Sequence, residues 1–148
     1  MNWNTVSNDK EAKELLRLFG GFHDACIKEA HLWTGHRVDS SLSMSCTGEM
    51  DTSMKFLVQR QFENPSCIEL LFEGITRFNF VPSPEGANSV IYESNLGENE
   101  GLFFWVVDTD QTLDVMNAIE DSWVTSQKLS WRAADDLLGR DLQYGSGT

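Results

Sequence analysis

The sequence Leu18-Phe19-Gly20-Gly21-Phe22-His23-Asp24-Ala25-Cys26-Ile27 marks the point where the chain changes from a helical pattern to a strand pattern. The adjacent glycines Gly20 and Gly21 can adopt positive φ without a Cβ clash, which favours a sharp end to a helix. Phe22 then returns the chain to the core, and Asp24 begins the first strand. We therefore expect this stretch to hold a helix against a sheet. It describes an architecture and names no reaction.

The residues before this stretch predict a helix over residues 9–19. Asn8 and Glu11 have the spacing of a capping box, and acidic side chains in the first turn suit the positive end of a helix dipole. One apolar stripe at helical spacing follows, made of Ala12, Leu15, Leu16 and Phe19. Such a helix is amphipathic, so it must pack against another layer.

The residues after the stretch predict about eight strands joined by short turns. Their alternating or continuous apolar patterns span residues 24–34, 37–46, 54–62, 68–73, 75–81, 90–94, 102–108 and 123–133. The run 37–46 alternates, with Val38, Leu42, Met44 and Cys46 on one face and Asp39, Ser41, Ser43 and Ser45 on the other. Gly74 is expected to break or bulge its strand, residues 95–101 are expected to form a loop, and residues 111–121 fit a short helix. Connections too short for crossover helices favour antiparallel pairing.

These patterns predict an α+β domain in which an N-terminal helix packs on a mainly antiparallel sheet. Whether the sheet stays open or closes into a barrel is left open by the patterns. A chain of 148 residues is typical of a single domain, 1–148, and we expect its ends, 1–7 and 143–148, to be flexible. Met1 to Asn4 lack the features of a secretion signal, and the longest apolar run, Leu102–Val107, is too short to span a membrane.

Charge and cysteine content narrow the function classes. The net charge of −12 opposes binding to nucleic acid or anionic lipid. The excess of acidic over basic residues is unevenly distributed: residues 1–84 carry a net charge of −3, and residues 85–148 carry a net charge of −9. Three cysteines without a close pair, Cys26, Cys46 and Cys67, suggest a cytoplasmic protein without disulfides or a zinc knuckle.

The acidic C-terminal half has two interpretations. It can serve solubility alone, or it can form a docking face for a basic partner. Under the second interpretation, the candidate contact residues are Glu98, Glu100, Asp108, Asp110, Asp114, Glu120 and Asp121.

A cluster of imidazole and carboxylate side chains suggests a metal site as an alternative. If a hairpin turn brings them together, the candidate ligands for zinc or iron are His23, Asp24, His31 and His36. A structural interpretation competes with this one, in which His23 and Asp24 form hydrogen bonds that cap the joint after the helix. We assign no metal or other cofactor from this pattern.

The stretch Phe103-Phe104-Trp105-Val106-Val107-Asp108-Thr109-Asp110-Gln111-Thr112 resembles the first motif of haloacid-dehalogenase-type phosphatases. That resemblance implies Asp108 as phosphoryl nucleophile and Asp110 as acid/base, with magnesium between them. The family's sheet is parallel, however, and only 36 residues follow Thr112, too few for the later motifs. A calcium loop in the same segment is excluded, because Leu113 and Ile119 occupy its glycine and glutamate positions. We therefore assign no catalytic residue.

The tryptophans are expected in the core because of their size. Trp123 and Trp131 are eight residues apart, so on a straight strand they share one face. An exposed pair would instead suit a protein interface.

A helix ending in Phe-Gly, followed by Phe22-His23-Asp24-Ala25 at a first strand, resembles a pattern in immunity proteins of bacterial polymorphic toxin systems. The specific part covers residues 15–33, and the remaining chain matches only in its rhythm of strands. The resemblance implies a cytoplasmic, non-enzymatic protein that neutralises a toxin by binding it, and many such toxins are basic nucleases. The function expected here is therefore an immunity-type inhibitor that covers a basic partner. The alternatives are a metal-dependent hydrolase or phosphatase-like enzyme, and a structural or assembly subunit.

Overall fold

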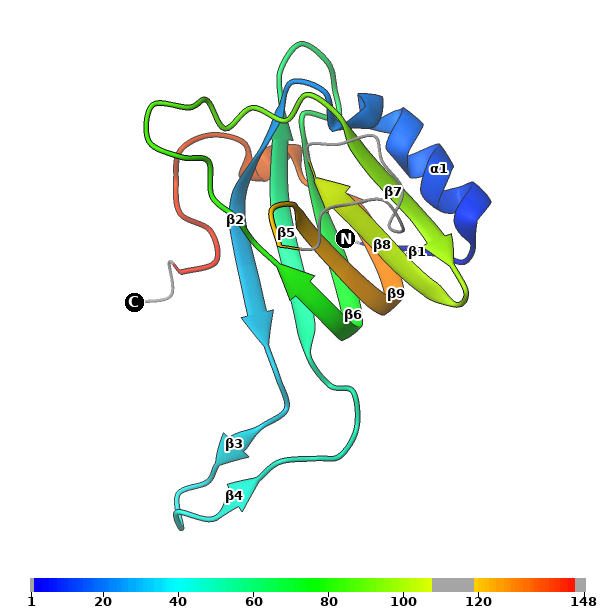
Figure 1. The fold of residues 1–148 in the computed structure, drawn as a ribbon. Helices are drawn as coiled ribbons and strands as arrows, with labels where there is room; N and C mark the ends of the chain where they lie inside the picture. The colour runs from blue at the N-terminus through cyan, green and yellow to red at the C-terminus, as the bar shows by residue number, and fades with distance from the viewer. Residues whose placement is uncertain (1, 108–118, 146–148) are drawn as a thin grey trace.

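The computed structural model describes residues 2–107 and 119–145, which form a helix beside a seven-stranded sheet (Figure 1). The elements are β1 (Asn4–Val6), α1 (Asp9–Leu18), β2 (Ala25–Trp33), β3 (Arg37–Val38), β4 (Met44–Ser45), β5 (Ser53–Arg60), β6 (Cys67–Asn79), β7 (Ser94–Asn99), β8 (Leu102–Val107) and β9 (Ser122–Ala133), with 3₁₀ turns at Gly20–Phe22 and Asp135–Leu137. The predicted α+β class and the predicted helix are confirmed. Most of the helix expected over 111–121 lies outside the described residues.

The sheet has the order β2-β5-β6-β9-β8-β7, and every described pair is antiparallel. Strand β9 is long enough to pair with β8 along its first half and with β1 along its second half. Because β2 and β7 stand at the two ends of this order, the described strands make an open sheet. The segment 1–7, expected to be a flexible end, contributes β1 to it.

The joint after α1 has the geometry that its glycines predict. Gly20 and Gly21 have φ values of 63° and 68°, which turn the chain out of the helix at low steric cost. Phe22 is fully buried, and its ring lies 5.1 Å from that of Phe19 and 5.1 Å from that of Trp105. The joint therefore fixes the helix to the centre of the core.

The main core fills one face of the sheet, with Trp105 at its centre. The Trp105 ring lies 5.3 Å from the Phe56 ring and 6.5 Å from the Phe72 ring, and its Nε1–H donates to Ser94 Oγ at 3.1 Å. Aliphatic side chains from the helix and the sheet complete the cluster, including Ala12, Leu15, Val58, Ile68, Leu70, Leu96, Val124 and Leu129.

Helix α1 also covers the edge of β7, which otherwise would present free backbone groups. Asp9 Oδ1 accepts from the Glu98 amide at 2.8 Å, and Lys13 Nζ donates to the Leu96 carbonyl at 2.8 Å. A side chain at Gly97 would collide with this contact, since a Cβ there would lie 2.7 Å from Lys13 Nζ. The helix thus protects the sheet edge through its polar side chains.

The prediction of one continuous strand over residues 37–46 is wrong. Only the two-residue strands β3 and β4 form there, and the chain turns between them. Asp39 causes this turn, because its carboxylate accepts from the amides of Ser41 and Ser43 and so competes with strand pairing.

Two further strand boundaries also differ from prediction. The expected loop 95–101 is mostly strand β7, paired with β8 through a tight turn at Glu100 and Gly101, both with positive φ. The expected strand 90–94 is irregular, with a single bridge between Ile91 and Ala25. The expected strand 75–81 continues β6, which passes through Gly74 with a register shift after Ile75.

Candidate binding surface

A hairpin arm, residues 34–52, extends away from the sheet between β2 and β5 (Figure 1). Its strands β3 and β4 pair at Val38 and Met44. The side chains of Val38, Leu42 and Met44 are 54%, 85% and 73% exposed, which is unusual for apolar residues gathered on one short hairpin. Exposed apolar clusters of this kind mark interaction sites.

Hydrogen bonds order the tip of the arm. The Asp39 carboxylate accepts from Ser41 Oγ at 2.6 Å and from the backbone amides of Ser41 and Ser43 at 2.9 and 3.1 Å. These bonds hold the pKa of Asp39 below its ordinary value, the Ser41 hydroxyl contributing most. Leu42 takes a φ of 66°, a conformation that costs free energy in a residue with a side chain. The tip therefore presents Leu42 to solvent in a fixed and strained conformation.

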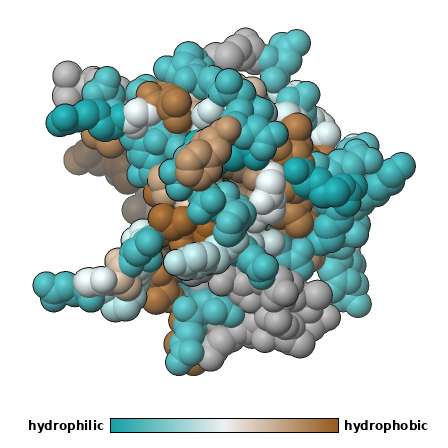
Figure 2. All heavy atoms as spheres, turned by 90° about the horizontal axis from the view of Figure 1, so that it is seen from above, coloured by the Kyte–Doolittle hydropathy of each residue, from teal (hydrophilic) through white to brown (hydrophobic). Residues whose placement is uncertain are grey.

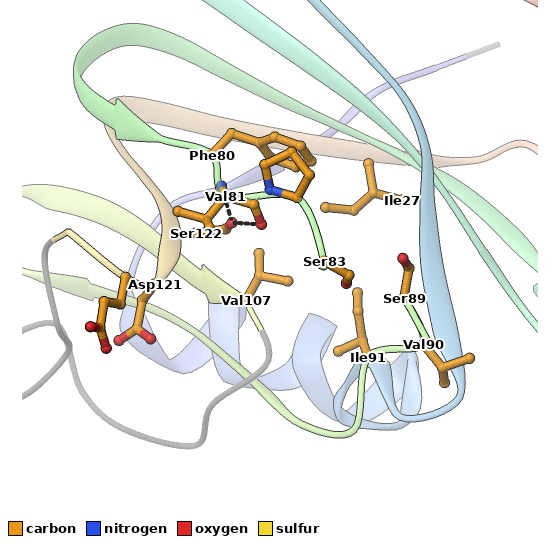
Figure 3. Close-up of a pocket in the computed structure, with 12 residues that line it drawn as sticks. Ile27, Phe80, Val81, Ser83, Ser89, Val90, Ile91, Val107, Asp121 and Ser122 are labelled. Carbon is orange, nitrogen blue, oxygen red and sulfur yellow. Dashed lines mark hydrogen bonds between the residues drawn. The ribbon is translucent and has the colours of Figure 1, made fainter. Parts of the chain in front are cut away.

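A cavity lies where the segment after β6 crosses the sheet (Figure 3). Its outer chamber has a volume of about 340 Å³ between Phe80–Ser83 and Ser89–Ile91 on one side and Ile27, Val107 and Glu120–Ser122 on the other. Ser122 Oγ accepts from the Val81 amide at 2.8 Å, which ties the crossing segment to the start of β9.

A second chamber of about 150 Å³ adjoins the outer one and shares with it Ile27, Phe80, Val107 and Ser122. Its remaining walls are mostly apolar, namely Ala30, Met54, Phe56, Phe78, Asn79, Trp105, Trp123 and Val124. The space-filling view from above shows apolar side chains that reach the surface between hydrophilic ones (Figure 2). Ala30, Phe78 and Phe80 are exposed, so this chamber also opens to solvent.

The opposite face of the sheet carries a buried carboxylate, Glu69, whose side chain is 0% exposed. Arg132 Nε and Nη2 lie 2.6 and 2.5 Å from Glu69 Oε1, Lys55 Nζ lies 3.5 Å from Oε2, and the Tyr144 hydroxyl donates to Oε2 at 2.6 Å. Burial, followed by the Glu69 carboxylate, raises the pKa of the Tyr144 phenol. The network joins β5, β6, β9 and the C-terminal segment in one structural unit.

A second carboxylate on this face, Glu29, binds the C-terminal segment through its backbone. It accepts from the Gln143 amide at 2.9 and 3.0 Å and from the Tyr144 amide at 2.8 Å, and Lys28 Nζ lies 3.7 Å away. Burial raises the pKa of Glu29, but the two amides and Lys28 outweigh it and hold that pKa below its ordinary value. Gln143 and Tyr144, expected to belong to a flexible end, are thus bonded to β2.

This depressed pKa predicts that acid releases the C-terminal segment. Because the folded-state pKa of Glu29 is lowered, its contribution to stability is present above the unfolded value and is lost as the pH falls below about 4. Hydrogen exchange of the Gln143 and Tyr144 amides should show lower protection factors at acidic pH than at pH 7.

The Ala134 amide, which donates to the Cys67 carbonyl at 2.8 Å, is the internal control, because no carboxylate accepts its bond. Its protection should change less than that of the other two amides. The variant Glu29→Gln should lower protection at Gln143 and Tyr144 already at pH 7. Equal protection of those amides at both pH values would contradict this role of Glu29.

The four candidate metal ligands lie in three separate places. His23 Nδ1 lies 2.7 Å from the Tyr92 carbonyl, and its Nε2 lies 3.5 Å from Asp24 Oδ2. The His31 ring lies 5.1 Å from that of Trp33, on the face with Tyr144. His36 Nδ1 lies 3.7 Å from an oxygen of Asp51, at the base of the arm. Within residues 2–107 and 119–145, no group of three or more histidine, cysteine or acidic side chains is placed to hold a metal.

The acidic candidates fall into separate places. Glu98 and Glu100 lie at the β7–β8 turn, whereas Glu120 and Asp121 precede β9 at the other end of β8 and line the outer chamber. The six residues of strand β8 separate these ends, a distance of about 17 Å at about 3.4 Å per residue. Asp108, Asp110 and Asp114, and with them the phosphatase-like motif, lie outside the described residues.

The expectation that the tryptophans lie in the core, with Trp123 and Trp131 on one face, is confirmed only in part. Trp123 is buried, but it packs with Phe104 and Val106, whereas Trp131 packs against the main core. The two tryptophans therefore belong to different clusters and do not share a face. Sequence reasoning missed Glu29, Glu69 and Tyr144, which carry no local pattern.

In the part of the chain that the structure describes, no helix has the length and apolar character needed to cross a membrane. Comparisons of the chain with protein-family models, with curated proteins and with solved structures find no match.

Proposed function

We propose that this chain is a non-enzymatic protein-binding module that inhibits a basic protein by covering it, as the immunity proteins it resembles do. The observation that carries the proposal is the ordered arm with three exposed apolar side chains, Val38, Leu42 and Met44. An arm exposed to solvent contributes little to the stability of the fold. Its ordered tip is therefore better explained by contact with another molecule.

The order of the arm supports tight binding. A segment already held in its bound conformation loses less conformational entropy on association. Asp39 supplies that order at the tip through Ser41 and Ser43, and Asp51 supplies it at the base, where it accepts from Thr47 Oγ1 at 2.9 Å and from the Gly35 amide at 3.2 Å. Leu42 is then the natural anchor, a side chain that enters an apolar pocket of the partner.

The net charge of −12 supports a basic partner. Opposite charges accelerate association and suppress binding to acidic proteins, and salt screens both effects. The acidic side chains at the two ends of β8 provide such a field on more than one side of the molecule. We accordingly expect the association rate to fall as ionic strength rises.

The cysteines fit a reducing compartment. Cys26 and Cys46 are exposed free thiols, and Cys67 is buried, where desolvation raises its pKa to about 12. We therefore place the protein in a bacterial cytoplasm as part of the same proposal.

The test is co-expression of the tagged chain with the products of its neighbouring genes. We expect one neighbour, toxic when expressed alone, to co-elute with the chain in a one-to-one complex. The variant Leu42→Asp should weaken that complex at least about a hundredfold, because it introduces a charge into an apolar contact. Affinity is measured by surface plasmon resonance at two salt concentrations.

Phe62→Asp is the matched control, since Phe62 is 88% exposed, has positive φ and lies outside the arm. It should leave affinity unchanged. Harmless neighbours without a complex would refute the proposal, as would equal effects of the two variants. A stable homo-oligomer that Leu42→Asp dissociates would instead identify the chain as an assembly subunit.

A further inference from the structure

The two strands at the ends of the sheet, β2 and β7, differ in how their outer edges are covered. Helix α1 covers β7 through Asp9 and Lys13, which bond to its backbone. The start of β2 is also covered, since the Ala25 carbonyl accepts from the Ile91 amide at 2.8 Å. Among residues 2–107 and 119–145, however, no strand pairs with the outer edge of the last four residues of β2, Ala30–Trp33. Figure 1 shows this end of β2 running toward the arm.

The side chains at this end of β2 are exposed on both faces. The four residues Ala30–Trp33 are all exposed, and the exposed fractions of Leu32 and Trp33 are 40% and 38%. A strand with one covered face alternates between buried and exposed residues, so four exposed residues in succession leave both faces open. The bulge of β2 lies earlier, between Ile27 and Glu29, and Ala30–Trp33 contains no proline, lysine or arginine. This edge therefore lacks the usual protection against pairing with another chain.

The second chamber is an open apolar groove that borders this edge. Ala30, Phe78 and Phe80 form its exposed rim, and Met54 and Phe56 belong to its lining. Because side chains of neighbouring strands lie side by side on one face, a strand added next to Ala30 would direct every second side chain toward this groove. The groove therefore favours an added strand with apolar residues at alternate positions.

The charge of the chain narrows the identity of the added strand. A second copy would bring together two chains that each carry a net charge of −12, and like charges oppose association. An extended segment with lysine or arginine between its apolar residues is attracted instead. Its basic side chains would lie on the face of the added strand opposite to the apolar ones.

We propose that the edge Ala30–Trp33 binds an extended basic segment of a partner protein as an additional strand, with the apolar side chains of that segment directed toward the groove. The free backbone groups of the edge supply hydrogen bonds, and the groove supplies side-chain specificity. The identity of the partner rests on the proposed function. Because the arm begins directly after Trp33, one partner can contact both the arm and the edge.

The test titrates the isotope-labelled chain with the peptide acetyl-Lys-Val-Lys-Val-Lys-Val-Lys-amide, followed by calorimetry and NMR. One counterpart has proline in place of the central valine, which interrupts strand pairing, and another has glutamate in place of every lysine. We expect saturable binding of the alternating basic peptide and at least about tenfold weaker binding of both counterparts. The amide signals of Ala30–Trp33 should shift, whereas those of β7, which α1 covers, should not.

Two variants with the same added charge locate the site. Leu32→Lys places a charged side chain on the edge and should weaken peptide binding at least about tenfold. Leu18→Lys is the matched control, since Leu18 is 46% exposed at the end of α1, and it should leave the affinity unchanged. Leu42→Asp, on the arm, should not weaken peptide binding, which separates this proposal from the function proposed for the arm.

Thermal unfolding of each variant shows whether it is folded. The proposal is overturned if the alternating basic peptide shows no saturable binding, if either counterpart binds equally well, or if folded Leu32→Lys retains full affinity. Shifted signals in β7 in place of Ala30–Trp33 would also overturn it, as would a dimer of the free chain that Leu32→Lys dissociates. If Leu32→Lys does not fold, the proline counterpart and the NMR signals decide. Peptide binding without any toxic neighbour would refute the proposed toxin partner and support the strand-binding edge.

Discussion

Replacing Arg132 with methionine is expected to destabilise the protein by about 3–5 kcal/mol, because the substitution leaves a buried carboxylate without its main partner. Glu69 is fully buried and takes two contacts from Arg132 at 2.6 and 2.5 Å. The remaining partners, Lys55 and Tyr144, offer one charge at 3.5 Å and one hydroxyl. The measurement is the free energy of unfolding in urea.

A double variant separates two costs in the free energy of unfolding: that of leaving the Glu69 carboxylate unpaired and that of losing the packing of the Arg132 side chain. Glu69→Met together with Arg132→Met should be at least about 1–2 kcal/mol more stable than Arg132→Met alone, since the buried carboxylate that lost its partner is then also removed. Arg77→Met, at an exposed arginine of the same sheet, should stay within about 0.5 kcal/mol of the unaltered chain. If Arg132→Met costs less than the control does, Glu69 does not depend on the pair.

Replacing Trp105 with alanine is the second large effect expected, a loss of about 3–5 kcal/mol from removed contacts and the void left behind. Its ring packs between Phe22 and Phe56 at 5.1 and 5.3 Å, and its indole N–H is satisfied by Ser94. For a domain of this size, such a loss lowers the unfolding temperature by about 10 °C or more. Calorimetry measures both quantities.

Trp105→Phe should retain part of this stability, because one ring remains in the core. Trp33→Ala is the matched control, since Trp33 is 38% exposed near the end of β2 and should cost less than about 1 kcal/mol. Similar losses from Trp33→Ala and Trp105→Ala would show that Trp105 does not organise the core.

Local signals predicted the helix and its end. The Asn8 cap, the apolar stripe and the paired glycines each act within a few residues, so they have the same meaning in any fold. The Asn8 side chain indeed accepts from the Glu11 amide at 2.9 Å. Period-2 alternation located β5 in the same way, because burial of one face is enough to impose it. A continuous apolar run located β8, which is buried on both faces.

Alternation failed where local hydrogen bonds compete with pairing. Val38, Leu42 and Met44 alternate as a buried strand would, yet Asp39 bends the chain and leaves all three in solvent. The Asp39-Ser40-Ser41 sequence carried that signal, because aspartate and serine favour turns through their own side chains. The arm was thus misassigned, because the alternating pattern does not distinguish a buried face from an exposed one.

By itself, the sequence determined the helix, its glycine joint, the antiparallel α+β class and the excess of negative charge, because each depends on neighbouring residues or on composition. Tertiary structure alone decided which distant residues meet. Glu69 and Tyr144 are 75 residues apart, and Ile27, Phe80, Val107 and Ser122 come together from four parts of the chain to form the cavity. Such contacts depend on strand order and register, which are set by packing of the whole sheet and leave no periodic signal in the chain.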